Sequence, residues 1–110
     1  IGEDEIRETL AEVGLDPDDK RTYRKYSLGM KQRLGIAAAI MEKPKLLVLD
    51  EPTNALDEAG VEMLKRVVAM AASTGREVLL SSHDGEVLEE LADRVYCMRD
   101  GAVVKVRERS

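Results

Sequence analysis

The sequence predicts an α/β fold organised around a parallel β-α-β unit, and three observations predict it. Residues 46–49 form an apolar run without polar alternation, which is typical of a strand buried on both faces of a parallel sheet. An amphipathic stretch over residues 55–72 follows, and a second apolar strand is expected over residues 77–82. A connecting helix makes two such strands parallel, so both are expected to end at the same edge of one sheet.

The composition is that of one globular domain with an aliphatic core. The chain has 110 residues, of which 44% are hydrophobic, and it contains neither Phe nor Trp. Its net charge is −5 and no basic patch stands out, which argues against nucleic acid as the main partner. Cys97 is the single cysteine, so no disulfide framework is expected and a reducing compartment is favoured. No apolar stretch approaches the roughly 20 residues of a membrane span.

Two helices are expected before the first strand. The first covers residues 3–13 and ends at Gly14, and a polar connector over residues 15–24 follows it. The second covers residues 28–42, with Ser27 as its N-cap. The apolar stripe of this second helix is expected to consist of Leu34, Ala37, Ala38 and Met41.

Further elements are expected around and after the second strand. The helix over residues 55–72 should face the core with Val61, Leu64, Val68 and Ala72. A short helix over residues 85–92 follows the second strand. Strands over residues 94–99 and 102–107 flank Asp100–Gly101, which is a typical hairpin turn.

Three polar residues are expected to gather at the carboxyl edge of the parallel strands. Asp50 and Glu51 end the first strand, and His83 follows the second. Open α/β sheets bind their ligands at this edge. Placing acids at the end of a core strand costs free energy unless they are paired, hydrated or bound to a metal. The sequence therefore predicts a site for Mg²⁺ and phosphate groups there.

These residue types suit transfer of a phosphoryl group from a nucleotide to water. Asp50 is placed to hold Mg²⁺, directly or through water. Glu51 can act as the general base towards the attacking water, a role that contributes about 10²–10⁴-fold in rate. His83 can donate to a γ-phosphate oxygen or position the water. Ser27, at a helix N-terminus that also carries Gly29, predicts an anion site formed by free backbone N–H groups.

Each of these residues also has a simpler interpretation. Adjacent acids often mark only a solvated strand end, and a serine before a helix is often only an N-cap. A histidine after a strand is often only a surface residue. Lys31 and Arg33 are most simply part of a solvated helix face, and Cys97 is most simply a small core residue.

Three stretches, at residues 26–34, 46–57 and 81–83, occur in an order and at a spacing that resemble those of the ATP-binding subunit of ABC transporters. YSLGMKQRL at residues 26–34 is similar to the signature motif of that family. LLVLDEPTNALD at residues 46–57 is similar to its Walker B motif and D-loop, and the SSH of residues 81–83 is similar to its switch-histidine segment. The signature most resembles that of bacterial exporters of peptide antibiotics and other drugs. The chain departs from the family pattern at Leu28, Met30 and Ala55.

The resemblance implies a role for each matching residue. Ser27 and Gly29 would contact the γ-phosphate of ATP bound by an opposite subunit. Asp50 would support Mg²⁺ and Glu51 would be the general base. Two further roles are implied for the D-loop acid Asp57, at the dimer interface, and for His83, which would sense the γ-phosphate.

The resemblance also implies that part of the ATPase is missing from this sequence. No phosphate loop of the form GxxxxGK[ST] occurs. Residues 1–45 would belong to the helical subdomain that carries the signature motif, and residues 46–110 would form the carboxyl-terminal part of a P-loop NTPase core. The chain alone is therefore expected not to hydrolyse ATP, and to self-associate through the strand edge that the absent phosphate-loop half would leave open.

The favoured function is that of an ATP-hydrolysing subunit that powers export of a drug or peptide. The intact subunit would act as a dimer with a second nucleotide-binding subunit, on a membrane permease at the cytoplasmic face of the membrane. Two alternatives stay open: a non-catalytic fragment that only assembles with a partner, and a soluble ABC-type ATPase without a permease.

Overall fold

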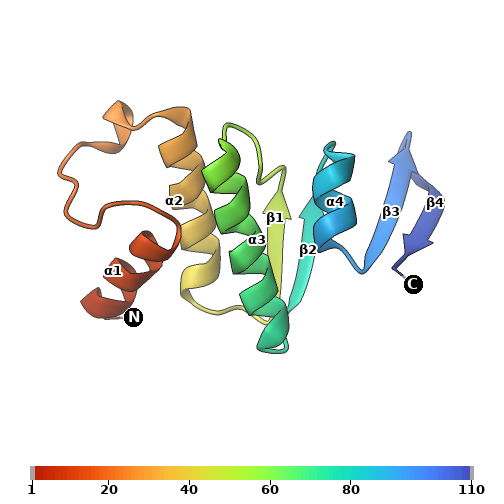
Figure 1. Ribbon diagram of the computed structural model, residues 1–110, viewed down its shortest axis with the longest axis horizontal. Coiled ribbons are helices and arrows are strands. Elements are labelled where there is room, and N and C mark those ends of the chain that lie inside the picture. Colours follow the sequence, from red (N-terminus) through yellow and green to blue (C-terminus); the bar gives the residue numbers. More distant parts are fainter. Residues whose placement is uncertain (1, 110) are drawn as a thin grey trace.

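The computed structural model describes residues 2–109, which form an elongated molecule of 46 × 29 × 23 Å. Helices α1 to α3 and the parallel strands occupy one end, and a separate β-hairpin occupies the other (Figure 1). None of the helices within residues 2–109 combines the length and the apolar composition of a membrane-spanning segment. The expected α/β class and element order are both observed.

The amino-terminal part is helical, as expected. Helix α1 covers Glu3–Glu12, and helix α2 covers Leu28–Met41. Ser27 is the N-cap of α2, where its Oγ accepts a hydrogen bond from the backbone N–H of Met30 at 3.1 Å. The connector also contains a 3₁₀ turn at Tyr23–Lys25, which was not expected from its polar sequence.

The parallel β-α-β unit is confirmed. Strand β1, Leu46–Asp50, pairs in parallel with β2, Glu77–Ser81, so that Asp50 lies opposite Ser81. Helix α3, which connects them, covers Glu58–Ser73 and begins later than residue 55. The later start has a local cause, because Ala55 has a φ of +64° and cannot begin a right-handed helix.

Helices α2 and α3 pack against one face of the parallel strands, and the core lies between them (Figure 1). On α3 the buried face is rotated from the expected one, because Ala72 is exposed while Met63, Val67 and Ala71 are buried. On α2, Ile36 is buried whereas the expected Ala38 is exposed. The core cluster consists of Val13, Leu15, Ile36, Ala37, Leu47, Leu49, Met63, Leu64, Val67, Val68 and Ala71.

The prediction that β1 is buried on both faces is wrong for the part of the chain that the structure describes. Leu47 and Leu49 are buried, but the alternate residue Val48 is 57% exposed. Leu79 of β2 is 59% exposed. Both helices that cover the sheet lie on the same face, and successive strand residues point to opposite faces. The apolar run therefore presents half of its side chains on an open face.

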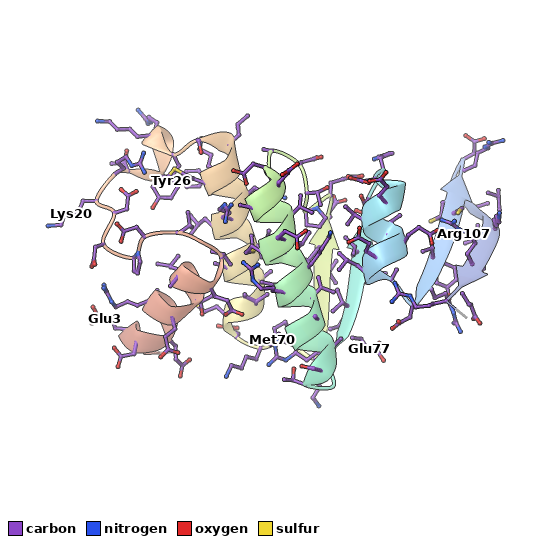
Figure 2. All side chains as sticks on the ribbon, viewed as in Figure 1. Glu3, Lys20, Tyr26, Met70, Glu77 and Arg107 are labelled. Carbon is purple, nitrogen blue, oxygen red and sulfur yellow. The ribbon has the colours of Figure 1, made fainter. Side chains whose placement is uncertain are left out.

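The carboxyl-terminal elements form a small unit beside β2. Helix α4, Gly85–Leu91, is capped by Asp84, and strands β3, Arg94–Arg99, and β4, Ala102–Glu108, form the expected antiparallel hairpin. Its turn has φ values of +51° at Asp100 and +79° at Gly101, as a type I′ turn requires. Arg107, labelled in Figure 2, joins β4 to α4, since its Nη1 donates to Glu89 Oε1 at 2.5 Å.

Candidate functional site

An open cleft of about 660 Å³ lies at the carboxyl ends of β1 and β2. It is the edge at which the sequence predicts the site. Glu51 and His83, the two predicted catalytic residues, both line the cleft. The remaining lining residues are Thr53, Asn54, Asp84, Gly85 and Glu86.

Ser81 joins the two predicted acids. Its Oγ donates a hydrogen bond to Asp50 Oδ1, and it also accepts one from the backbone N–H of Glu51 at 3.1 Å. The same Glu51 N–H donates to the Ser81 carbonyl at 2.9 Å. No role of its own was predicted for Ser81 from the sequence. Its position at the end of the strand paired with β1, opposite Asp50, is the signal that could have identified it.

The side chains of Glu51 and His83 are in direct contact. His83 Nδ1 lies against Glu51 Oε1, and the imidazole is 97% exposed whereas the Glu51 side chain is 24% exposed. The contact was expected only as proximity at one edge, and the structure brings the two groups within hydrogen-bond reach. In this arrangement the imidazole offers a hydrogen-bond partner to the carboxylate that lines the cleft.

Glu51 has a strained backbone, with a φ of +47°. A non-glycine residue in this region costs about 1–3 kcal/mol and persists only where its surroundings fix it. Three residues hold the Glu51 backbone here. Ser81 accepts a hydrogen bond from the Glu51 N–H, and the Glu51 carbonyl accepts from the Asn54 N–H at 3.1 Å and from Gln32 Nε2 at 3.2 Å. The sequence alone predicts no such contact for Gln32.

The amino-terminal end of α2 lies beside the loop that follows Glu51. A Cβ atom at Gly29 would lie 2.9 Å from the carbonyl oxygen of Ala55. Gly29 therefore permits a close approach of the protein's own backbone, in addition to the phosphate approach that the sequence suggests. Ser27 and Gly29 do not line the cleft, so the structure separates the predicted anion site from Glu51 and His83 within this chain.

Asp57 caps helix α3, because its Oδ1 accepts from the Gly60 N–H at 2.8 Å. The same oxygen contacts Arg33 Nη2 at 3.3 Å. The interpretation of Arg33 as part of a solvated face is wrong, since its side chain is only 17% exposed and its Nη1 donates to the Val13 carbonyl at 2.7 Å. A guanidinium can make both contacts because its donors diverge in one plane.

The donor set at the strand end fits Mg²⁺ of the kind that also binds phosphates. Such ions take one or two carboxylates and keep water or phosphate oxygens as other ligands. Asp50 offers an exposed carboxylate, with the Ser81 hydroxyl beside it. Within residues 2–109, no group of three or more His, Cys, Asp and Glu side chains could hold a metal by itself.

Comparison with known proteins identifies the class. Residues 2–54 match the family model described as ABC transporter. The chain is 42% identical over 108 residues to a lantibiotic transport ATP-binding protein of Streptococcus pyogenes. This alignment covers 98% of this chain and 47% of that protein. It is also 41% identical over 101 residues to a bacitracin transport ATP-binding protein of Enterococcus faecalis, in an alignment that covers 91% of this chain and 33% of that protein.

The fold agrees with the sequence match. The structure of a dimeric ATP-binding cassette in a post-hydrolysis state, bound to ADP and Pi, aligns with a TM-score of 0.87 and 25% identity over 96% of this chain and 46% of that one. The chain is thus a part of an ABC transporter ATP-binding domain, with a partial P-loop NTPase fold. It spans about half the length of the lantibiotic relative, or 47%.

Proposed function

We propose that this chain supplies the hydrolytic part of an ATP-binding subunit that powers an ABC exporter. The observation that carries the proposal is the contact of His83 Nδ1 with Glu51 Oε1 beside Asp50, at the carboxyl edge of a parallel sheet. A carboxylate oriented by an imidazole suits a general base towards water, and a second carboxylate next to it suits a metal that holds phosphates.

The residues divide the reaction between them. Glu51 accepts the proton of the attacking water, and His83 keeps its carboxylate oriented and can donate to the γ-phosphate. Asp50, held by Ser81, would support Mg²⁺. When bound, Mg²⁺ neutralises charge that develops on the phosphate oxygens. ATP is the cofactor that this arrangement implies.

The signature residues serve a second subunit in this proposal. Ser27 and Gly29 lie at an exposed helix N-terminus away from the Glu51 cleft, so they would bind the γ-phosphate of ATP held by the partner subunit. Asp57, whose side chain is 77% exposed despite its contacts with Gly60 and Arg33, would lie at that dimer interface. The dimeric state of the solved cassette supports this arrangement.

We further propose a membrane permease as the other partner and a peptide antibiotic or drug as the exported substrate. The support is similarity to lantibiotic and bacitracin transport ATP-binding proteins. The subunit would then lie on the cytoplasmic face of the cell membrane, bound through the permease.

We expect this chain alone neither to hold nor to hydrolyse ATP. Its cleft is lined by the carboxylates of Glu51, Asp84 and Glu86, and by no Lys or Arg side chain of the described residues 2–109. Three carboxylates repel the phosphates of ATP, and a basic residue would have to come from outside the cleft.

The test is Mg-ATP binding by the chain alone and by the chain mixed with the upstream half of an ATP-binding domain. Binding only in the mixture, followed by turnover, supports the proposal. Assembly of the two parts without ATP binding would instead support a non-catalytic interaction module. ATP turnover by the chain alone would contradict the division of the site.

A further inference from the structure

The loop between β1 and α3, residues 51–57, needs outside support to keep its shape. We call it the acid loop because it begins with Glu51 and ends with Asp57. Two of its non-glycine residues have positive φ, Glu51 at +47° and Ala55 at +64°. Backbone in this region is disfavoured for residues with a Cβ atom, and it persists only where contacts determine it.

One face of helix α2 supplies contacts along the whole acid loop. Gln32 Nε2 donates to the Glu51 carbonyl at 3.2 Å, at the start of the loop. Gly29 meets the Ala55 carbonyl, from which a Cβ atom would be only 2.9 Å away. Arg33 Nη2 contacts Asp57 Oδ1 at 3.3 Å, at its end. Positions 29, 32 and 33 are spaced by three and four, so they share one helix face.

Gly14 and Gly60 leave room for the guanidinium of Arg33 because they have no side chains. A Cβ atom at Gly14 would lie 2.3 Å from Arg33 Nη1, and one at Gly60 would lie 3.1 Å from Arg33 Nη2. Its Nη1 also donates to the carbonyl of the buried Val13, at the end of α1. Arg33 therefore connects the end of α1 to the start of α3 across α2, and a lysine with its single ammonium cannot make both contacts in this geometry.

We propose that Gln32 and Arg33 are positioning residues. They fix the acid loop, and with it the Glu51 backbone, to helix α2 of the same chain, which we call the signature helix because it carries the signature motif. The proposal rests on the proposed function for its consequence. Because the amino-terminal end of α2 would face ATP on the partner subunit, a shift of α2 would move the general base of its own subunit. The signature helix would thus couple the two nucleotide sites of a dimer through contacts within each chain.

The first test needs only the chain itself. Amide hydrogen exchange is measured for Asn54, Leu56 and Gly60, whose N–H groups bond within the acid loop and its cap. We expect Gln32→Glu, which keeps the shape but loses the donor, and Arg33→Lys to raise exchange at these amides about tenfold, as for local opening. Exchange in the β1–β2 ladder should stay unchanged, which separates loop release from global unfolding.

Arg66→Lys is the matched control, because Arg66 is an exposed arginine on α3 whose side chain forms no hydrogen bond or ion pair within residues 2–109. Unchanged exchange at all three amides in both test variants, with the ladder intact, would overturn the proposal. A variant whose β1–β2 amides also lose protection is replaced by Arg33→Gln, which keeps an amide donor but removes the charge that contacts Asp57.

The second test concerns the intact ATP-binding subunit that carries this chain. Turnover is divided by the amount of bound ATP, so that misfolded protein does not count. We expect Gln32→Glu and Arg33→Lys to lower kcat about 10²-fold while KM for ATP stays constant, because a displaced base loses rate and not binding. A change in KM alone would overturn the positioning role. A wild-type subunit without turnover would refute the proposed function, while the exchange result would still decide whether α2 holds the loop.

Discussion

His83 Nδ1 contacts Glu51 Oε1 across the ends of two adjacent parallel strands. The histidine is almost fully exposed, so the contact is not imposed by burial. It joins residues that are 32 positions apart in the sequence and that only the β1–β2 pairing brings together. The functional predictions about this edge of the sheet start from that contact.

We predict that Glu51→Gln in the intact subunit lowers ATP turnover by at least about 10²-fold and leaves ATP binding in place, because the amide cannot accept the water proton. Steady-state phosphate release and nucleotide binding measure the two effects. Glu8→Gln, on the exposed face of α1, is the matched control and should behave as wild type. Equal loss of binding and turnover would argue against a base.

His83→Ala should also lower turnover, because Glu51 then loses the group that orients its carboxylate. We expect a reduction of about tenfold or more and no change in stability beyond about 0.5 kcal/mol, since the imidazole is exposed. Phosphate release and urea denaturation measure the two quantities. If His83→Ala turned over ATP normally, the contact with Glu51 would have no catalytic role.

Ser81→Ala should destabilise the fold, in contrast to His83→Ala. The Ser81 hydroxyl donates to Asp50 and accepts from the Glu51 N–H, so its loss leaves both partners without this bond. We expect a decrease of about 0.5–1.5 kcal/mol in the free energy of unfolding, measured by urea denaturation. Ser73→Ala is the control: that hydroxyl donates to the Met70 carbonyl of its own helix, and we expect a change within about 0.5 kcal/mol.

The sequence predicted most elements because each has a local cause. Ser27 caps α2, Asp100–Gly101 makes the hairpin turn, and the apolar run forms β1 at the expected residues. Glu51 and His83 could be placed at one edge because parallel strands end together.

Contacts between elements were harder to predict. Arg33 resembles a solvated helix residue in the sequence, and only the approach of α1 and α3 to α2 gives its guanidinium partners. Ala72 fits the helical period, but the sheet and α2 select a face of α3 centred on Met63 and Val67 instead. The open face at Val48 arises because both covering helices lie on one side, which a continuous apolar run does not reveal.

Two substitutions at Asp57 can separate its contribution to stability as a helix cap from its contribution as an ion-pair partner. Asp57→Asn keeps a side-chain oxygen for the Gly60 N–H but removes the charge that faces Arg33. Asp57→Ala removes both, and we expect it to cost about 0.5–2 kcal/mol of unfolding free energy, with Asp57→Asn costing less. Urea denaturation of both variants measures the difference, and equal losses would show that the charge and not the cap matters.

The open sheet face should make this chain self-associate. Val48 and Leu79 expose 57% and 59% of their surfaces on neighbouring strands, and no described element pairs with the outer edge of β2. Apolar strand surfaces with free edges bind other copies of the same chain. We expect light scattering at tens of µM, about the range in which such surfaces associate, to detect dimers or larger species.

The variant that tests this is Leu79→Lys, which places a charge on the open face next to the β2 edge and should shift the chain towards monomer. Met70→Lys is its matched control, because Met70 is 57% exposed but lies on helix α3, away from that face (Figure 2). Association that persists in Leu79→Lys but is lost in Met70→Lys would assign the interface to the helical side. A wild-type chain that remains monomeric at these concentrations would show that neither the open face nor the free edge is sufficient for association.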